Sequence, residues 1–499
     1  MRARLSLPCG KVFMLDTTKL KKYLGDARFW RDIARLALPI ALQNLLSSSF
    51  SLVDTLMVGQ LGDTPLAAVG MAGQFGWFLS MILFGMTSAL TMFVSQYWGA
   101  HDIKSIHKVY GIALAIALGV AGVFTIIAGA AFPRGVVWIF NREADVLDVG
   151  AQYLSIAAFS YPAIALNYVF MGVLRSTERV KLPLYATLVT TLLNAGLDYA
   201  FIFGFGFIPA MGARGAAIAT VISAWLSPLI TFAVSLIEKN MLIAPIREIF
   251  GFDGDFVRVF LRRALPVVAN ETLWGAGTLV FNIIFANLGS GNYAAVTIMR
   301  TFESIAFVFF VGLGSASSVI VGKSVGAGDI TAAVRDSRRF AVLVPSFSLL
   351  LGAVIIIFRR PIVGVFDLGG TITAETLNTA VWILSIYAAE MAIRNIPYIM
   401  ICGIFRPGGE TKMGMKFDLL FLWCVSLPAT LIAAFVLRLP FPAVFATMYI
   451  AEDWLKAVFC VRYFLTERWL KPVTEEGVAG LEAYRAARDA DRDTGTATR

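Results

Sequence analysis

The sequence predicts an all-α polytopic membrane protein with twelve transmembrane helices in two six-helix lobes, related by a pseudo-twofold axis along the membrane normal. Three observations support this fold class. The 499-residue chain is 58% hydrophobic and 15% charged, with a mean hydropathy of +0.75, whereas soluble domains carry about 25% charged residues. The second half of the chain repeats the first, and the basic residues gather in alternate loops. A membrane protein built by internal duplication satisfies all three.

The internal repeat has a constant offset of 227 residues. Residues 37–103 match residues 264–330 without a gap, and 20 of the 67 positions are identical. The match begins with Ala-Leu-Pro, which occurs at 37–39 and again at 264–266. Each copy contains six spans, an even number, so both copies enter the membrane in the same direction and are parallel repeats. Such duplicated hydrophobic chains are typical of secondary transporters, whose binding site lies between the two halves.

Twelve apolar segments reach the length of about 20 residues that a helix needs to cross a bilayer. They are 36–59, 66–96, 109–133, 147–174, 182–204, 215–237, 264–288, 293–322, 340–365, 377–405, 414–437 and 440–464. The chain accordingly divides into a basic cytoplasmic N-terminal segment (1–35), a first lobe (36–237), a cytoplasmic loop between the lobes (238–263), a second lobe (264–466) and a cytoplasmic C-terminal tail (467–499). The N-terminal segment is either a plain tail or a short amphipathic helix on the inner leaflet. From about Lys471 on, the C-terminal tail is rich in Ala, Arg, Asp and Glu and is expected to be solvated.

The net charge of +9 reflects membrane topology rather than a nucleic-acid partner. With both termini in the cytoplasm, the inward-facing segments hold 34 of the 42 Lys and Arg residues. This asymmetry is the one that orients membrane proteins. We therefore expect a multi-pass protein of the plasma (inner) membrane, with both termini cytoplasmic and no nucleic acid bound.

The sequence contains no signature of an enzyme or of a nucleotide site. Gly322-Lys323-Ser324 resembles the end of a phosphate-binding loop, but the earlier glycine that such a loop requires is Ser317 here. The four cysteines and two histidines have neither a disulfide framework nor metal-ligand spacing. We therefore expect no catalytic activity, no cofactor and no metal beyond Na⁺. Transport would draw its energy from an ion gradient or from the substrate's own gradient.

Two carboxylates lie within the apolar spans of the first lobe. An ionisable side chain at the bilayer centre costs about 2.5–3.5 kcal/mol, so each is a candidate functional group. At a helical rise of about 1.5 Å per residue, Asp54 and Asp198 reach the same depth in the outer half of the bilayer. Asn194 lies one turn before Asp198, and Thr220 falls near the same level. These four residues predict a cation or proton site; the alternatives are capping at the membrane edge for the carboxylates and interhelical hydrogen bonds for the other two.

In the second lobe, Asn270 and Glu271 lie within the seventh span. No basic residue lies three or four positions from Glu271 on its own helix, so its carboxylate is expected to be unpaired. An unpaired acid at that depth would bind a proton or attract a cation, which suggests a group that binds substrate or a second ion. The alternative is a neutral, hydrogen-bonded glutamate that fixes helix packing.

Two further pairs of charged residues have helical spacing. Glu390 and Arg394 are spaced i,i+4, and Arg300 and Glu303 are spaced i,i+3, so each pair is expected to neutralise itself on its own helix. We expect a structural or gating role for these four residues. Asp418, near the inner end of the eleventh span, is expected to be exposed or to act as a cap.

Several short motifs occur in an order shared with a known transporter family. The first lobe contains Leu38-Pro39, Val53-Asp54-Thr55, Gly59-x-Leu61-Gly62, Gly172-Val-Leu-Arg175, Asn194-x-x-x-Asp198 and Gly212-x-x-Gly215. The second lobe contains Gly403-x-x-Arg406 and, directly after it, Pro-Gly-Gly-Glu410-Thr-Lys412. This ordered set, spanning residues 30–470, resembles the multidrug and toxic compound extrusion family.

The resemblance implies a V-shaped pair of six-helix bundles that alternates access and exports cationic, lipophilic compounds in exchange for H⁺ or Na⁺. Small organic cations would be its substrates, the lipid bilayer its surroundings, and a monomer its functional state. The resemblance also implies that four residues form the family's first-lobe ion or proton site: Asp54, Asn194, Asp198 and Thr220. Glu271 departs from the pattern, because the sodium-coupled branch has its span-seven acid one helical turn further from the proline.

Two other function classes are less well supported. Relatives with the same two-lobe architecture flip lipid-linked saccharides, but a diphosphate cargo needs several Arg or Lys side chains in the cavity. In this sequence the unpaired intramembrane charges are expected to be acidic. A membrane-bound enzyme would need a nucleophile, a base or a metal cluster, and none is visible. The sequence therefore favours a cation-coupled exporter, with a flippase for lipid-linked saccharides as the alternative.

Overall fold

The computed structural model describes residues 26–206, 208–365 and 373–493, and these residues are mostly helical. The first lobe comprises α2 (Ala27–Gly59), α3 (Asp63–Gly99), α4 (Ile103–Thr125), η1 (Ile126–Ala131), α5 (Pro133–Trp138), α6 (Ala144–Ala157), η2 (Ala158–Ser160), α7 (Tyr161–Ser176), α8 (Lys181–Phe203) and α9 (Ala213–Glu238). The short helix α10 (Ile246–Ile249) lies in the connection between the lobes. The second lobe comprises α11 (Gly254–Asn287), α12 (Ser290–Gly326), α13 (Ile330–Gly364), α14 (Ala374–Tyr398), η4 (Ile399–Phe405), α15 (Lys412–Leu419), η5 (Leu420–Ser426), α16 (Leu427–Leu431), η6 (Ile432–Val436), α17 (Phe441–Tyr449), η7 (Ile450–Trp454) and α18 (Leu455–Leu465). The last helix is α19 (Glu475–Asp493).

The helices account for the twelve predicted spans. Eleven helices of the described chain are long and apolar enough to cross a membrane. The twelfth span is the continuous helix formed by α17, η7 and α18. It differs from the others in composition because Glu452, Asp453 and Lys456 lie in its middle. Four segments in the last three spans of the second lobe are π-helical, namely η4, η5, η6 and η7. This geometry often occurs at functional sites.

The repeat extends to the residues that begin the helices. Asp26 caps α2 by accepting a hydrogen bond from the Phe29 N–H at 3.2 Å, and Asp253, at the same offset, caps α11. A second pair at this offset, Asp102 and Asp329, caps α4 and α13. A carboxylate at the N-cap satisfies backbone N–H groups that have no partner within the helix. The helices α2 and α11 therefore begin before the apolar runs that predict them. Of the basic segment expected at 1–35, the residues from Ala27 on belong to α2. Residues 1–25 lie outside the described ranges.

The two lobes meet along a seam of close glycine contacts. A methyl group placed on Gly99 would lie 2.0 Å from the carbonyl oxygen of Lys323, and one placed on Gly326 would lie 1.9 Å from the carbonyl oxygen of Gln96. Adding or subtracting the 227-residue offset converts each of these contacts into the other, because Gly99 is equivalent to Gly326 and Gln96 to Lys323. The reciprocal pairs are Gly99 with Lys323, Gly326 with Gln96, Gly85 with Val268, and Gly312 with Ala41. Since a twofold interface is self-complementary, this reciprocity supports the predicted pseudo-twofold axis.

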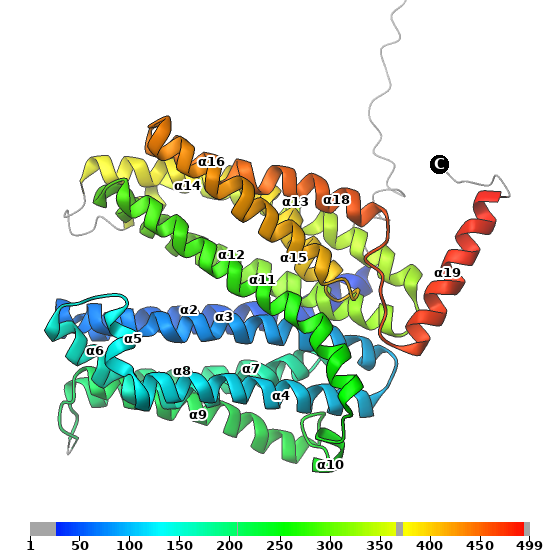
Figure 1. The fold of residues 1–499 in the computed structure, drawn as a ribbon, viewed down its shortest axis with the longest axis horizontal. Helices are drawn as coiled ribbons and strands as arrows, with labels where there is room; N and C mark the ends of the chain where they lie inside the picture. The colour runs from blue at the N-terminus through cyan, green and yellow to red at the C-terminus, as the bar shows by residue number, and fades with distance from the viewer. Residues whose placement is uncertain (1–25, 207, 366–372, 494–499) are drawn as a thin grey trace, which may run out of the picture.

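In the described ranges, the lobes converge toward one end of the helices. Figure 1 shows two layers of long helices that converge toward α10 and α19 and separate toward α5 and α16. We call the converging end the basic end, because the basic loops lie there. Polar contacts between the lobes occur at this end: Gln96 donates to the Pro407 carbonyl at 2.7 Å, and Lys323 pairs with Glu178 at 2.7 Å. Toward the opposite end of α2, side chains such as Leu52 are exposed.

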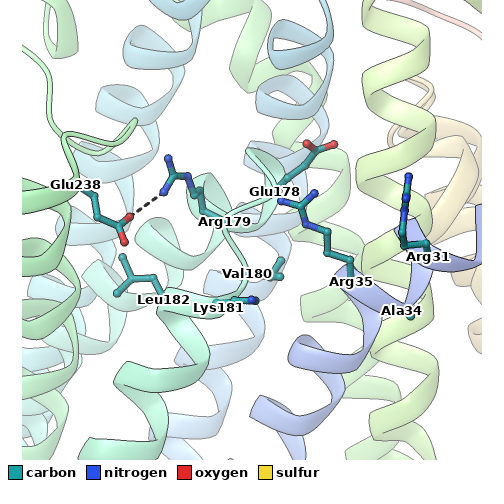
Figure 2. A pocket seen from close by; sticks show the side chains of 9 residues that line it. All are labelled: Arg31, Ala34, Arg35, Glu178, Arg179, Val180, Lys181, Leu182 and Glu238. Carbon is teal, nitrogen blue, oxygen red and sulfur yellow. Dashed lines mark hydrogen bonds and ion pairs between the residues drawn. The ribbon is translucent and has the colours of Figure 1, made fainter. Parts of the chain in front are cut away.

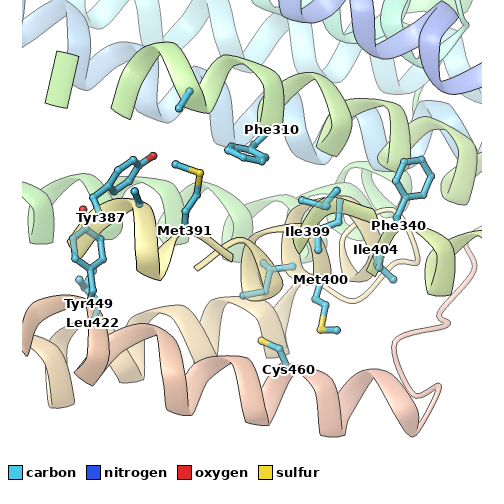
Figure 3. Packing of buried hydrophobic residues seen from close by; sticks show 14 of the residues in the cluster. Phe310, Phe340, Tyr387, Met391, Ile399, Met400, Ile404, Leu422, Tyr449 and Cys460 are labelled. Carbon is cyan, nitrogen blue, oxygen red and sulfur yellow. The ribbon is translucent and has the colours of Figure 1, made fainter. Parts of the chain in front are cut away.

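The buried apolar cores of the two lobes interlock at the basic end. The second-lobe core includes Phe310, Met391 and Met400, drawn together in Figure 3 from α12, α14 and η4. It also receives Ile33 from α2 of the first lobe, and the first-lobe core receives Phe260 from α11. Ile33 and Phe260 occupy equivalent positions of the two repeats, 227 residues apart, so each lobe contributes the same position to the core of the other. Because lipid chains are as apolar as these side chains, close packing rather than transfer from water stabilises such contacts in a bilayer.

The C-terminal segment is packed against both lobes instead of being solvated throughout. Trp469 and Leu470 are buried. The Val473 N–H donates to the Gln96 side chain of the first lobe at 2.8 Å, and the Thr474 hydroxyl donates to the Gly326 carbonyl of the second lobe at 2.8 Å. The expectation of a solvated tail was therefore wrong for this part, because its few apolar residues fit the seam; most of α19 is exposed.

Candidate functional site

The first-lobe carboxylates come together on two parallel helices. Gln43 of α2 donates to the Thr187 hydroxyl of α8 at 2.9 Å. Asp54 and Asp198 each lie eleven residues, or three helical turns, beyond this contact. They therefore share one depth and one face of the α2–α8 pair. The Arg175 guanidinium of α7 strengthens this register by donating to Gln43 Oε1 at 2.7 Å.

These two carboxylates lack hydrogen-bond donors. Asp198 is 1% exposed, and neither of its side-chain oxygens has a partner among the described residues. One oxygen of Asp54 is buried and unpartnered in the same part of the structure. The two side chains are close enough for their charges to interact. A buried carboxylate without a donor or a counter-charge is stable only if it takes up a proton or a cation.

Two further side chains complete this group. The Tyr153 hydroxyl of α6 interacts with Thr220 of α9 and with the charges of Asp54 and Asp198. Thr220 also donates to the Ala216 carbonyl at 2.9 Å, which leaves its oxygen lone pairs for other partners. The structure thus brings three predicted residues together around Tyr153. Tyr153 itself was missed, since one tyrosine among 14 on an apolar helix carries no sequence signal.

Asn194 is the fourth residue of the predicted site. It lies one turn before Asp198 on α8 and is partly buried. Its side chain forms no hydrogen bond with another residue in the described ranges. Its placement on the Asp198 helix agrees with the sequence spacing, but no contact joins it to the carboxylates.

Glu271 is paired, contrary to the sequence expectation. Its carboxylate lies 2.6 Å from Arg406, and the two side chains are 11% and 5% exposed. Arg406 follows η4, far along the chain, so no helical spacing could reveal the pair. The same guanidinium donates to the Ser88 hydroxyl of the first lobe at 3.2 Å. A methyl group on Gly85 would lie 3.3 Å from Glu271, which places this ion pair at the seam.

Asn270 belongs to a second buried polar group. Its amide donates to Asp418 at 3.0 Å, and Asp418 lies 3.4 Å from the Lys456 ammonium. Lys456 also pairs with Glu452 at 2.7 Å and with Asp453 at 3.3 Å. Asp418 is therefore not exposed or a cap as expected, because Lys456 of the last span reaches it. We call the group of Asn270, Asp418, Glu452, Asp453 and Lys456 the second-lobe cluster. Its three carboxylates share one ammonium group. The side-chain amide oxygen of Asn270 has no partner among the described residues.

Three of the four charged residues that were expected to pair within their own helices have partners on other helices instead. Arg394 lies 2.5 Å from Glu303 and donates to the Tyr449 hydroxyl at 3.1 Å. Glu390 instead accepts a hydrogen bond from the Trp454 indole at 2.7 Å. Arg300 forms no ion pair with any residue in the described ranges. The intrahelical pairing was wrong because neighbouring spans offer closer partners, and these contacts bind α12, α14 and the last span into one bundle.

Comparisons with known proteins agree with this architecture. The MatE family model matches residues 39–200 and 266–441, one match in each lobe. A Thermotoga maritima protein named "Probable multidrug resistance protein NorM" is 25% identical, over 88% of this chain and 93% of its own length. The multidrug resistance protein NorM of Burkholderia vietnamiensis is 26% identical, over 80% and 85%.

Solved structures share the fold. The Vibrio cholerae MATE transporter VcmN superposes with a TM-score of 0.79 at 20% identity, covering 88% of this chain and 97% of that one. A MOP superfamily transporter from Pyrococcus furiosus gives the same TM-score at 18% identity, covering 90% and 97%. With a family model that matches more than half of its length, this chain belongs to the MatE family of efflux transporters.

Proposed function

We propose that this chain is a secondary antiporter that exports cationic, lipophilic small molecules in exchange for H⁺ or Na⁺. Its sequence relatives named above are multidrug resistance proteins, which supports a broad range of small-molecule substrates. Asp54 and Asp198 bind the coupling ion in this proposal. Tyr153 and Thr220 supply neutral oxygens beside them, and Asn194 extends the polar face.

The observation that carries the proposal is the pair of buried carboxylates without donors. Two carboxylates in one poorly hydrated site repel each other, so at least one takes up a proton or a cation. Uptake of H⁺ or Na⁺ removes the repulsion, and loss of the ion restores it. The group therefore has two states of different charge, which is what coupling to an ion gradient requires.

Alternating access would proceed by opening the seam. We place the basic end in the cytoplasm, because positive residues concentrate on that side of membrane proteins; the protein then lies in the plasma (inner) membrane with the described lobes open outward. Opening toward the cytoplasm would break the Arg406–Ser88 and Lys323–Glu178 contacts between the lobes. Both lobes and the carboxylate pair belong to one chain, so we propose a functional monomer.

A lipid-linked saccharide flippase has less support. A diphosphate headgroup needs basic side chains that are free to bind it. Three cations within the spans of the second lobe are each bonded to a carboxylate, namely Arg394, Arg406 and Lys456, whereas Arg300 forms no ion pair in the described ranges. In the first lobe, Arg175 is held by the Gln43 carbonyl.

The test uses purified protein in liposomes loaded with ethidium, under separate inward proton and sodium gradients. We expect one gradient to drive export in the wild type, and Asp54→Asn and Asp198→Asn to abolish it. Asp63→Asn is the matched control, since Asp63 is an exposed carboxylate at the start of α3, and it should keep full export. Absence of ethidium movement under both gradients would overturn the proposal and favour the flippase.

A further inference from the structure

A large pocket opens at the basic end of the first lobe, outside the carboxylate site. It has a volume of about 810 Å³ and is bounded by the first turns of α2, the connection from α7 to α8, and the end of α9. Figure 2 shows the side chains of Arg31 and Arg35 on one side and those of Arg179 and Lys181 on the other. Basic pockets between spans at this level are suited to anionic lipid headgroups.

The positive charge of the pocket is not neutralised by its own acids. Its two carboxylates are already engaged: Glu238 pairs with Arg179 at 3.0 Å, and Glu178 pairs with Lys323 at 2.7 Å. The three remaining cations, Arg31, Arg35 and Lys181, are exposed and form no ion pair within the described ranges. The pocket therefore has a net positive charge that an anion would compensate.

The start of α8 adds backbone donors to the same place. Val180, Lys181 and Leu182 line the pocket. Val180 is the N-cap of α8 and provides no side-chain acceptor. The first N–H groups of α8 therefore lack a capping side chain, and the positive end of the helix dipole favours a negative group there.

Apolar stripes lead from the pocket along both helices. On α2, the turns after Arg35 expose Leu38 and Leu42, which are 66% and 44% exposed. On α8, the residues after Lys181 at helical spacing are Tyr185 and Val189, which are 58% and 50% exposed. A soluble phosphate would use only the pocket. A molecule with an anionic head and long apolar chains would use both features.

We propose that this pocket binds the phosphate headgroup of an anionic phospholipid, with its acyl chains along the exposed stripes of α2 and α8. Arg31, Arg35 and Lys181 bind the phosphate, together with the N-terminus of α8. The bound lipid bridges the two helices that carry Asp54 and Asp198, and it lies beside Glu178, which ties the first lobe to Lys323 of α12. The proposal does not depend on which ion is transported.

The test measures lipid binding to the purified full-length protein by native mass spectrometry. The wild type is mixed with phosphatidylglycerol, with phosphatidylcholine, and with inorganic phosphate at millimolar concentration. We expect phosphatidylglycerol to bind at least about tenfold more tightly than phosphatidylcholine, and the double variant Arg35→Gln/Lys181→Gln to lose about tenfold in phosphatidylglycerol affinity.

Two matched variants make the result interpretable. Arg258→Gln/Arg485→Gln removes the same charge from exposed positions outside the pocket and should bind like the wild type. Arg35→Lys/Lys181→Arg keeps the charge and should also bind. Equal affinity for both lipids, or equal losses in the two glutamine variants, would overturn the proposal. Displacement of phosphatidylglycerol by inorganic phosphate would assign the pocket to a soluble anion and would likewise overturn it.

Discussion

Glu271 of α11 and Arg406 form a buried ion pair, 2.6 Å long, whose guanidinium also donates to Ser88 of the opposite lobe. The pair therefore connects the second lobe to the seam as well as to itself. Gly85 lies against it from the first lobe. A residue expected from the sequence to be a free acid is thus part of the joint between the lobes.

Removing the carboxylate should destabilise the protein through the charge that remains. Glu271→Gln leaves Arg406 buried without a counter-charge, and breaking a buried pair in this way costs about 3 kcal/mol. Denaturant titration in detergent micelles measures the loss. The double variant Glu271→Gln/Arg406→Met should recover most of it, and Glu143→Gln, an exposed glutamate, should be neutral. An unchanged unfolding free energy in Glu271→Gln would contradict the structural role.

The seam glycines should control how closely the lobes approach. In Gly326→Ala the new methyl group would lie 1.9 Å from the Gln96 carbonyl, so the backbones must separate by at least about 1 Å. Spin labels on α4 and α13 near the basic end should report a longer interlobe distance. Gly119→Ala is the control, since nothing lies within 4 Å of its methyl position. Identical distances in the two variants would show that the seam is not closed in solution.

The Tyr153 hydroxyl should tune ion binding without being essential to it. In Tyr153→Phe the hydroxyl beside Thr220 and the two carboxylates is removed while the ring is kept, and loss of one polar interaction corresponds to about fivefold in apparent affinity for the coupling ion. Export assays at graded proton or sodium concentrations measure this shift. Tyr110→Phe removes a buried hydroxyl from α4 and should leave the ion dependence unchanged; a shift of equal size there would remove Tyr153 from the site.

Glu410 should make the docking of the C-terminal segment sensitive to acid. It lies in the turn before α15, outside the spans. Burial disfavours its charged form, but hydrogen bonds from Lys471, the Met413 N–H and Tyr463 hold its pKa below the ordinary value of 4.5. Because the folded pKa is lowered, the stabilisation is present above the unfolded pKa and is lost as the pH falls through the folded pKa.

Thermal unfolding in detergent at several pH values checks this expectation. At neutral pH, Glu410→Gln should be about 1 kcal/mol less stable than the wild type. The difference should shrink as the pH falls below 4.5. Glu482→Gln, on the exposed part of α19, serves as the control and should follow the wild type at every pH. A difference that stays constant with pH would contradict the assignment.

The sequence predicts the features that depend on periodicity and spacing along one chain. The constant offset predicts the pseudo-twofold, and the apolar runs predict all twelve spans. The common depth of Asp54 and Asp198 follows from helical rise alone, and in the structure the two side chains are close enough for their charges to interact. Such properties are local or repeat along the chain, so they do not require knowledge of how helices pack.

The partners of buried charges depend on packing and were not predictable. Glu271 meets Arg406 across 135 residues, and Asp418 meets Lys456 between two different spans. Within the predicted twelfth span, helical spacing does reveal the pairing of Lys456 with Glu452 and Asp453, but it does not reveal the approach of Asp418 from another span. Helical spacing can reveal only partners on the same helix, so the assignment of Glu390 to Arg394 failed where Trp454 was closer.

The reciprocal seam has a consequence for how the two lobes can diverge. In a homodimer, one substitution at a twofold interface changes both halves together. Here the two halves are encoded separately, so Gly99 and Gly326 can be kept while the residues around them differ. The first lobe has a carboxylate pair where Asp54 corresponds to Phe281 of the second, and the second has Glu271 where the first has Asn44. Fusion of the copies thus permits carboxylates without partners in one lobe, while the other lobe uses a carboxylate in an ion pair at the seam.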